Sequence, residues 1–546
     1  MIAVEELLLK GGDLLRRGDW SGAREAFAAV LAGRVDPACE AAAAEGVAAA
    51  CWWLDDDAEV VGRYEQAYRC YRAVGDDRGA ARVAAWLGNH AAQFRGETAV
   101  AQGWFRRAGR LLAPLSEGEE HGLLALFEGM AARMLGDCAA ALELAERAMA
   151  AGRRVASPDL EIQAMALSGT AYVGRGQVRR GMRLLDEAAV AAFAGEVGEV
   201  GSVWIPACYL VQGCEQARDW ERAEQWCERV LDFCSRFDLG SPFARCRTHY
   251  STVLLWRGDW AGAESQLRRA ADDLQARRPR FATEAWARLG ELRRRQGRWD
   301  EAAELFRLCQ DLPAARIGRA ELLLDQGDAP AAVEIAERAL DGLGAEHRME
   351  RAAALEVLIR AAVAAGRKDP LAHAVAELTE IARGVDGDAM RASALWAQGV
   401  QCGALGDDRR AITLLATGVE LFERARGPYD AARARLDLAR ALAVNGRTGP
   451  AAEEARAARN TFERLGATGD ARRASGLTRG RVGGALTPRQ IEILRLLAVG
   501  LTNKEIAERV TLSEHTVKRH VANILTRLDL PSRAAAVAYA SRADLL

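Results

Sequence analysis

The sequence predicts an all-α protein, an α-solenoid of about twelve helical hairpins followed by a four-helix helix-turn-helix domain. Two observations carry this prediction. A helix stop, usually glycine, recurs about every 40 residues through the first 465 residues. The last sixty residues or so contain four short helical patterns with their own start and stop signals. A chain of 546 residues is also too long for one compact core, so a repeat array or several domains are expected.

The repeat unit is a helix ending in glycine, a polar residue and a second helix. The clearest copies are Gly18-Asp19-Trp20, Gly258-Asp259-Trp260 and Gly297-Arg298-Trp299. Five residues after each glycine stand Ala23, Ala263 and Ala302, and nine residues after it stand Phe27, Leu267 and Phe306. Glycine supplies the left-handed residue that stops the first helix, and alanine lets the second helix approach closely. The larger residue then fills the groove between hairpins, which must stack to bury their apolar faces.

Weaker copies of this unit continue along the chain. They begin at Gly96, Gly136, Gly176, Arg218, Gly327, Gly366, Gly406 and Gly446, and one lies around Asp55-Asp56. From Gly297 to Gly327 the spacing falls to 30 residues and includes Pro313, which predicts a shortened helix or loop. On these residues the body resembles a tetratricopeptide-type α-solenoid, with a period near 40 instead of about 34 residues.

The periodicity stops after Leu465. The run Gly466-Ala467-Thr468-Gly469-Asp470, and the glycines from Gly476 to Gly484 with Arg479 and Arg481, predict a flexible basic linker. We therefore expect three parts: a tetratricopeptide-like α-solenoid at 1–465 that senses a ligand or partner, a flexible linker at 466–484, and a helix-turn-helix domain at 485–546.

The C-terminal residues carry the signals of four helices. Thr487-Pro488-Arg489-Gln490 starts the first helix with a cap and a proline, and Gly500 ends it. Thr502, Ser513 and Ser532 cap the next three helices, and Glu505 completes a capping box with Thr502. Only Val510-Thr511-Leu512 separates the second helix from the third, so the chain must turn sharply there. Two helices joined in this way form a helix-turn-helix, whose second helix can lie in a DNA major groove.

The stretches LTPRQ, GLTNKEIAERV and LSEHTVKRHVANILTRL resemble the DNA-binding domain of LuxR-type bacterial transcriptional regulators. The resemblance covers about the last sixty residues without a gap, and the body is similar to the helical arms of large relatives of the maltose activator. It implies a transcriptional regulator whose partner is double-stranded promoter DNA. Many large relatives carry an ATPase, but no GxxxxGK[ST] motif occurs here, so we expect neither that domain nor any cofactor.

The third helix of this domain is the expected DNA reader. Val517, Val521, Ile524 and Leu528 form its apolar stripe. The opposite face carries the expected base-contacting residues Lys518, Arg519, His515 and Ala522. The resemblance implies that Lys518 and Arg519 reach base edges, and both can donate to guanine O6 and N7. Ala522 replaces a long polar residue of the relatives, so it touches a thymine methyl group or leaves that base unread.

Contacts to phosphate are expected mainly at the starts of the second and third helices, where backbone N–H groups and the helix dipole favour anions. The residues expected to make them are Thr502, Asn503, Lys504, Ser513, Thr516, Asn523 and Arg527. The competing interpretation is that these polar and basic residues form only a solvated face. The capped helices and the short turn favour the DNA-binding interpretation.

The fourth helix has apolar residues on more than one side. In the family this helix pairs with its twin, so Ala534, Val537 and Ala538 are expected at the interface of a homodimer bound to an inverted repeat. A monomer that dimerises only on DNA is the alternative.

Other function classes find little support in the sequence. The eleven cysteines include no CxxC pair, and five histidines lie in separate hairpins, so we expect no metal site and no enzyme. Trp20, Trp220, Trp260 and Trp299 share one repeat position, which indicates packing residues. Trp52, Trp53, Trp104, Trp204, Trp286 and Trp396 lie outside that register, where a core position is favoured over a ligand-binding concave face.

The charge distribution points to one basic end. Residues from Arg481 onward include ten Lys/Arg and six Asp/Glu, whereas the first 480 include 64 and 70. The N-terminus lacks a signal-peptide pattern and no apolar run approaches membrane length, so a cytoplasmic protein without membrane contact is expected. A protein or small-molecule effector on the solenoid is expected, and RNA polymerase is a candidate partner. The alternatives are a repeat adaptor whose C-terminal domain serves dimerisation, and a sigma-factor-like promoter reader.

Overall fold

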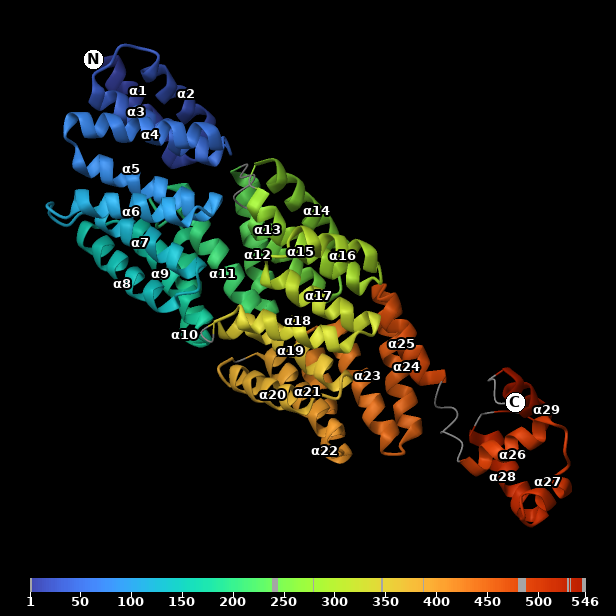
Figure 1. The fold of residues 1–546 in the computed structure, drawn as a ribbon. Coiled ribbons are helices and arrows are strands. Elements are labelled where there is room, and N and C mark those ends of the chain that lie inside the picture. The colour runs from blue at the N-terminus through green and yellow to red at the C-terminus, as the bar shows by residue number, and fades with distance from the viewer. Residues whose placement is uncertain are drawn as a thin grey trace.

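The computed structural model describes residues 2–237, 244–277, 279–344, 347–385, 387–479, 488–527, 530 and 532–542. These residues form helices joined by short turns and include no β-strand, which confirms the all-α prediction. A long helical body leads to a small C-terminal domain at one end (Figure 1).

Twelve helical hairpins make up the body. The first six are α1 (Ile2–Arg17) with α2 (Trp20–Leu31), α3 (Pro37–Trp53) with α4 (Asp57–Val74), α5 (Asp77–His90) and η1 (Ala91–Arg95) with α6 (Thr98–Leu112), α7 (Glu119–Met134) with α8 (Cys138–Val155), α9 (Pro158–Gly174) with α10 (Val178–Phe193), and η2 (Val200–Val203) and α11 (Trp204–Ala217) with α12 (Trp220–Arg236). The next six are α13 (Ala244–Arg257) with α14 (Trp260–Arg277), α15 (Pro279–Arg295) with α16 (Trp299–Leu308), α17 (Pro313–Gln326) with α18 (Ala329–Asp341), α19 (Arg348–Ala364) with α20 (Lys368–Arg383), α21 (Asp388–Ala404) with α22 (Asp408–Arg424), and α23 (Pro428–Val444) with α24 (Thr448–Leu465).

The turns inside the hairpins lie where the sequence predicts them. Each of the twelve predicted stops has a positive φ, and ten of them are glycines. The other two are Asp55 (φ 60°) and Arg218 (φ 54°), which adopt a conformation that costs a non-glycine residue free energy. The expected count of about twelve hairpins is therefore confirmed.

In two of the three clear copies, the residue nine positions after the glycine stop fills the groove between hairpins as predicted, and the third, Leu267, is buried. Phe27 lies between Gly11 of α1 and Gly46 of α3, where an added Cβ would come within 2.8 and 2.5 Å of its ring. Phe306 lies in the same way between Gly290 of α15 and Gly318 of α17. The predicted shortening is also present, because α16 has only 10 residues and Pro313 begins α17.

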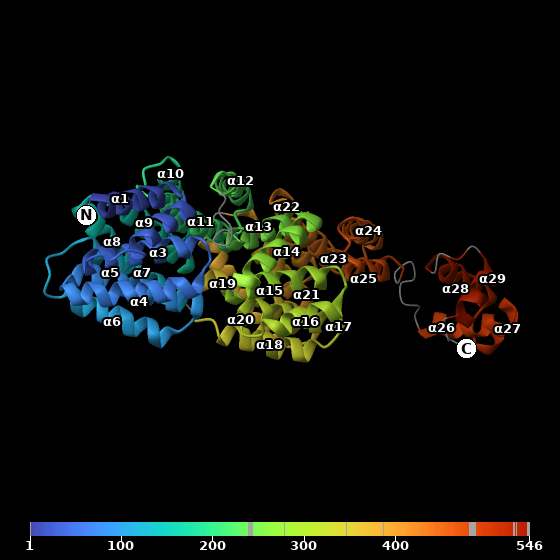
Figure 2. The same ribbon diagram turned by 90° about the horizontal axis from the view of Figure 1, so that it is seen from above.

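The two helices of a hairpin differ in burial. In α9, twelve of 17 residues are buried on all sides of the helix, whereas in α10 seven of 16 are buried along one face. A helix that is apolar all round is covered all round, and an amphipathic helix faces solvent. Figure 2 shows α4 and α6 at the edge of the molecule and α3, α5 and α7 toward its interior. In these hairpins the first helix therefore lies deeper in the superhelix than the second.

Successive turns of the superhelix touch one another, so hairpins far apart in sequence are in contact. Arg218 at the sixth hairpin turn binds Glu356 of α19, with nitrogen–oxygen distances of 2.6 and 3.0 Å, and Ser393 of α21 at 2.8 Å. The indole of Trp256 donates to the carbonyl of Ala425 at 2.8 Å. Simple solenoid repeats contact only their neighbours, whereas these side chains join repeats that are four or five apart.

One prediction about the linker is wrong. Residues Thr468–Arg479 form a further helix, α25, which packs against α24 and closes the end of the body. Asp470 is buried, accepts a hydrogen bond from Tyr429 Oη at 2.9 Å and pairs with Arg473 at 2.7 Å. Gly466 has a φ of 79° and ends α24, so it acts as a helix stop and not as the start of a flexible segment. Residues 480–484 of the expected linker lie outside the described residues, as do residues 485–487 of the expected helix-turn-helix domain.

The C-terminal domain contains α26 (Pro488–Ala498), α27 (Asn503–Arg509), α28 (Glu514–Arg527) and α29 (Arg533–Arg542). Among the helices of the described ranges, none combines the length and apolar character that crossing a lipid bilayer requires. The division at 465 and 485 into a sensing body and a DNA-binding domain stays a prediction.

Candidate nucleic-acid interface

The start of each of the last three helices is capped as the sequence predicts. Thr502 Oγ1 accepts from the backbone N–H of Glu505 at 3.4 Å, and Glu505 accepts from the N–H of Thr502 at 2.7 Å. The hydrogen bonds that the Glu505 carboxylate accepts from the N–H and the hydroxyl of Thr502 lower the pKa of Glu505. Ser513 Oγ accepts from the N–H of Thr516 at 3.1 Å, and Ser532 Oγ accepts from that of Ala535 at 3.2 Å. The caps fix where α27, α28 and α29 begin.

A small apolar core holds the four helices together. It contains Ile493, Leu494, Leu497, Ile506, Ala507, Val510, Val517, Val521, Ile524, Ala536 and Ala540. In α28 the predicted stripe of Val517, Val521 and Ile524 is buried, and the side chain of Leu528 lies outside the described residues. In α26 the buried side chains include Ile493, whereas Ile491 is only half-buried.

The turn between α27 and α28 is as short as predicted. Thr511 occupies the left-handed region with a φ of 54°, which is unusual for a β-branched residue. The N–H of Leu512 donates to the carbonyl of Ala507 at 3.0 Å, which closes the turn between the end of α27 at Arg509 and the start of α28 at Glu514. Ala507 is 6% exposed at this crossing, where its small side chain lets the two helices approach.

The predicted base-contacting residues lie on the exposed surface of α28. His515, Lys518, Arg519 and Ala522 are all exposed, and they stand opposite the buried stripe of Val517, Val521 and Ile524. Neither Lys518 nor Arg519 forms an ion pair with a described acidic residue. Their charged ends are therefore available to an external acceptor.

The predicted phosphate-contacting residues fall into two groups. Thr502, Lys504, Ser513 and Asn523 are exposed, whereas Asn503 and Thr516 are half-buried. The Oδ1 atom of Asn503 accepts from Arg533 Nη1 at 2.8 Å, and Thr516 Oγ1 lies 2.7 Å from Ser513 Oγ. The side chain of Arg527 lies outside the described residues.

Two arginines that the sequence reading did not single out hold the ends of α27 in place. Arg533 of α29 donates to Asn503 and to the carbonyl of Leu501, and Arg489 of α26 donates to the carbonyl of Val510. Both arginines stand in the first turn of a helix, where the helix dipole disfavours a positive charge. An arginine at this unfavourable position in the sequence indicates that its side chain makes a compensating contact elsewhere in the domain.

The apolar residues of the fourth helix differ in burial. Ala536 and Ala540 are buried in the domain core, so these faces of α29 are occupied within one chain. Of the predicted dimer contacts, Ala534 is exposed and Val537 is half-buried, while the side chain of Ala538 lies outside the described residues. The dimer interface stays a prediction.

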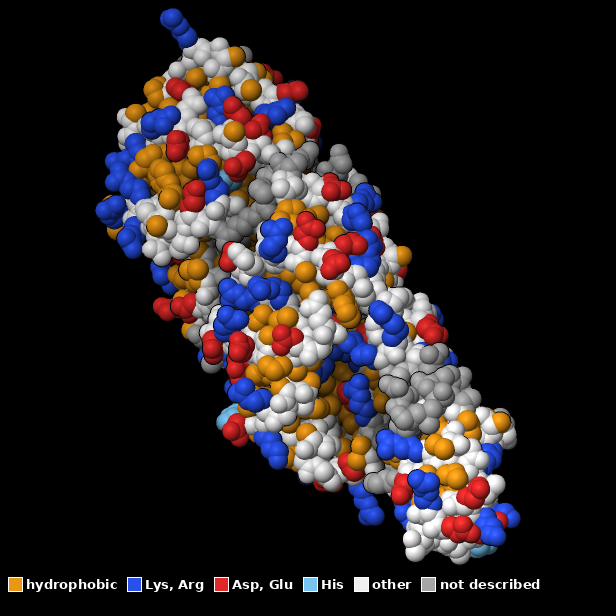
Figure 3. Space-filling model, turned by 45° about the vertical axis from the view of Figure 1, so that its right-hand side comes forward, with side chains coloured by type: hydrophobic (Ala, Val, Ile, Leu, Met, Phe, Trp, Pro, Cys, Tyr) orange, Lys and Arg blue, Asp and Glu red, His pale blue; other side chains and the backbone are white. Residues whose placement is uncertain are grey.

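The face of the body drawn in Figure 3 carries charged side chains of both signs. Lys and Arg side chains alternate with Asp and Glu over this face, and a hollow walled partly by hydrophobic side chains opens in its lower half. Among the described residues, no three His, Cys, Asp or Glu side chains are grouped to hold a metal ion. Trp20, Trp220 and Trp260 are buried, as expected of packing residues, and Trp299 is half-buried.

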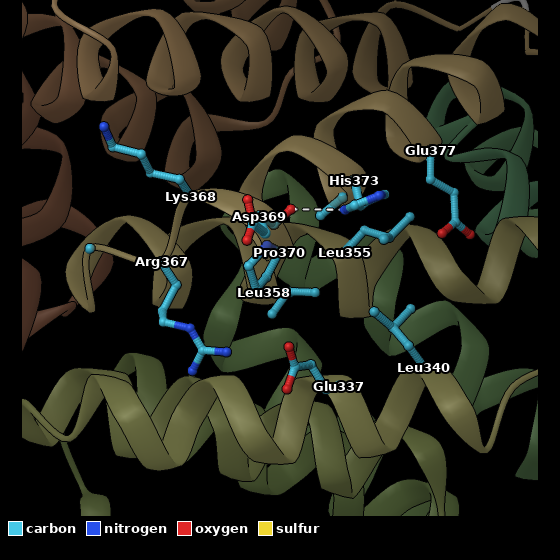
Figure 4. Close-up of a pocket in the computed structure, with 12 residues that line it drawn as sticks. Glu337, Leu340, Leu355, Leu358, Arg367, Lys368, Asp369, Pro370, His373 and Glu377 are labelled. Atoms are coloured by element: carbon cyan, nitrogen blue, oxygen red, sulfur yellow. Dashed lines mark hydrogen bonds between the residues drawn. The ribbon is translucent and has the colours of Figure 1, made fainter.

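A groove of about 760 Å³ lies on the body between α18 and α20. Glu337 and Arg367 face it from these two helices, and His373 Nδ1 lies 3.0 Å from the carbonyl oxygen of Asp369 (Figure 4). The charges around it are mixed in sign, and no aromatic side chain except His373 lines it.

Comparison with known proteins identifies both parts of the chain. Residues 484–540 match the model of the luxR family of bacterial regulatory proteins, and residues 285–313 match a tetratricopeptide repeat model. The transcriptional regulatory protein LiaR of Bacillus subtilis is 48% identical over 62 residues, which are 11% of this chain and 29% of LiaR. An HTH-type transcriptional regulator of Mycobacterium tuberculosis is 33% identical over 238 residues, which are 41% of this chain and 25% of that protein. The chain thus covers less than a third of either relative.

Two solved structures overlay on most of the chain with low scores. The APC/C hetero-tetramer Cut9-Hcn1 gives a TM-score of 0.34 at 15% identity, covering 86% of this chain and 96% of that one. A Rap protein complexed with Competence and Sporulation Factor gives 0.36 at 12% identity, covering 85% and 98%.

Proposed function

Since the C-terminal domain is a LuxR-type helix-turn-helix domain and the body carries tetratricopeptide repeats, we propose that the chain is a transcriptional regulator that binds promoter DNA. In this proposal α28 lies in the major groove, where Lys518 and Arg519 donate to guanine O6 and N7. The capped starts of α27 and α28 lie against the phosphate backbone. The carrying observation is the exposed strip of His515, Lys518, Arg519 and Ala522 opposite the buried face of α28.

The repeat body would supply the control. We propose that an effector bound by the body alters how the C-terminal domain engages DNA. Support comes from the helix α25, which is packed against the body through Asp470 and Arg473 and precedes the DNA-binding domain directly in the chain. A change in the body that moves α25 would therefore reach the start of the DNA-binding domain.

Selection of bound sequences from random DNA duplexes with the full chain tests this function. We expect an enriched inverted repeat, because a two-fold dimer presents two copies of α28 to two half-sites. The absence of any enriched sequence would contradict the proposal. In that case, a stable protein partner recovered with the full chain would favour the adaptor alternative.

A further inference from the structure

Helices of the first superhelical turn surround a cavity of about 540 Å³. Its lining comes from α1 to α5, α7, α9, η2 and α11. The turn closes on itself because η2 returns to the first hairpins, where Gly201 lies against the ring of Trp53 and Val200 lies beside Gly18. Small-molecule sites are commonly concave spaces of roughly 300–1,000 Å³, so this cavity has a suitable size.

Aromatic side chains form most of the apolar wall. The lining includes Trp20, Trp52, Trp53, Trp86, Trp204, Tyr64, Tyr71 and Phe127. Trp20 and Trp53 stack with ring centroids 4.7 Å apart, and Trp86 and Phe127 meet edge to face at 4.7 Å. These contacts hold the rings in fixed orientations. Tryptophan and tyrosine faces attract cations, including quaternary ammonium groups.

The charged residues of the lining are almost all acidic. They are Glu45, Glu119, Glu120, Asp159 and Glu199, with Arg82 as the one basic residue. Arg82 pairs with Glu45 at 2.6 Å and with Glu120 at 3.6 Å, and Arg78 also pairs with Glu120 at 3.1 Å, so these two positive and two negative charges compensate one another.

The other three carboxylates, Glu119, Asp159 and Glu199, lie outside every ion pair formed by the described residues. Asp159 accepts from the backbone N–H groups of Gly198 and Glu199 at 2.7 and 3.1 Å, which fixes it next to Glu199. The Glu199 side chain reaches solvent, yet the surrounding protein atoms, followed by Asp159 and Glu119, raise its pKa. A cation placed here would relieve this repulsion between carboxylates.

We propose that this cavity binds a small organic cation. Such a molecule matches the aromatic wall and the three carboxylates that lie outside the ion pairs of the described residues. The binding of the cation is inferred from the cavity alone. Its role as the effector of the regulator rests on the function proposed above. The groove between α18 and α20 is lined by charges of both signs and no ring except that of His373, so it lacks these features.

Calorimetric titration of the full chain, without DNA, tests the proposal. The probes are tetraphenylphosphonium and its anionic isostere tetraphenylborate, which have almost the same shape and opposite charge. We expect saturable binding of the cation and binding of the anion at least about tenfold weaker, because only the cation interacts favourably with the carboxylates.

Three variants locate the site. Glu199→Gln should weaken cation binding about tenfold, because it removes one negative charge with little change in shape. Trp86→Leu should also weaken it, because it removes a ring from the wall. Glu377→Gln, in the groove of Figure 4, is the matched control and should leave binding unchanged. The melting temperature of each variant shows whether it is folded.

Equal affinity for the two isosteres, or cation binding that is unaffected by Glu199→Gln in a folded protein, would overturn the proposal. Retention of short basic peptides without binding of tetraphenylphosphonium would overturn it as well. Because the titration contains no DNA, its outcome is independent of whether the C-terminal domain reads promoters. A change in DNA affinity when the cation is added tests the effector role separately.

Discussion

At the scale of single residues, the molecule separates side chains that hold the C-terminal domain together from those that face outward. Arg489 and Arg533 donate hydrogen bonds to groups at the ends of α27. Arg489 donates to the carbonyl of Val510, and Arg533 donates to Asn503 Oδ1. Lys504, Lys518 and Arg519 are exposed. The basic residues of this domain therefore differ in role. Arg489 and Arg533 stabilise the fold, whereas Lys504, Lys518 and Arg519 are available to DNA.

Arg519→Ala and Lys504→Ala should weaken DNA binding in different ways. Loss of a bidentate contact to guanine should cost about 1–3 kcal/mol at one base position and relax the preference there. Loss of a phosphate contact should weaken all sequences alike and reduce the salt dependence of binding. Fluorescence anisotropy with the selected operator and single-base variants, over a series of salt concentrations, distinguishes the two. A uniform loss in both variants would contradict the assignment of Arg519.

The acid–base behaviour of Glu215 is also a property of single residues. Burial raises its pKa, but Arg288 and His249 outweigh this effect and lower the pKa from the usual 4.5 to about 2. Glu215 Oε2 lies 2.6 Å from His249 Nδ1, and Glu284 is a neighbouring carboxylate. A lowered pKa stabilises the folded state above pH 4.5, and this contribution is lost as the pH falls toward 2.

The expected result is that Glu215→Gln lowers the melting temperature at neutral pH. The difference from the unmodified protein should shrink as the pH falls below 4.5, because the carboxylate then becomes protonated in the unfolded state and later in the folded state. Melting curves of the two proteins over this range provide the measurement. A difference that stays constant down to pH 2 would mean that the charge of Glu215 is not the cause.

At the scale of elements, each hairpin depends on the residue that fills its groove. Phe306→Ala in α16 should destabilise the body by about 3–5 kcal/mol, because its ring is fully buried between Gly290 and Gly318. Leu308 lies in the same helix with 50% of its surface exposed, so Leu308→Ala serves as the control and should have little effect. Denaturant unfolding of both variants checks the prediction. Equal effects would show that groove filling is not what stabilises the hairpin.

The sequence predicts local features of these elements well. The left-handed stop, the close-packed alanine and the groove-filling residue lie within ten residues of one another, and Gly18, Ala23 and Phe27 take the expected roles. The sequence did not predict helix α25, because a glycine such as Gly466 is equally common in flexible linkers and at helix ends. The difference lies in Asp470, which is stabilised by Tyr429 and Arg473, and Tyr429 is 41 residues away along the chain.

Contacts between superhelical turns were not predictable from the repeat. Arg218 occupies the turn position where most hairpins have glycine. Its ion pair with Glu356, 138 residues later in the chain, explains why an arginine is found there. The cavity of the first turn has the same origin, because its wall combines residues from six hairpins. For the DNA-binding surface, burial and exposure on α28 could be predicted from helical spacing, whereas the engagement of Asn503 by Arg533 could not.

At the scale of the whole molecule, the packed superhelical turns should make the body unfold more cooperatively than an open solenoid. Arg218→Gly tests this, because glycine keeps the left-handed turn but removes the contacts to Glu356 and Ser393. We expect a lower stability and a reduced dependence of unfolding free energy on denaturant, since parts of the body would unfold separately.

Arg426→Gly is the matched control for this variant. Arg426 has nearly the same φ, 55°, but its side chain is exposed, so its replacement should leave the unfolding transition sharp. Equal broadening in both variants would indicate that the backbone conformation, and not the contact between turns, governs cooperativity.

The central claim is that this chain acts on promoters through the exposed face of α28. Genome-wide DNA occupancy of the full chain, compared with that of a Lys518→Ala, Arg519→Ala double variant, tests it most directly. The account predicts discrete promoter peaks for the unmodified chain and their loss in the double variant, with the amount and folding of the protein unchanged. Peaks that persist at the same promoters in the double variant would contradict it.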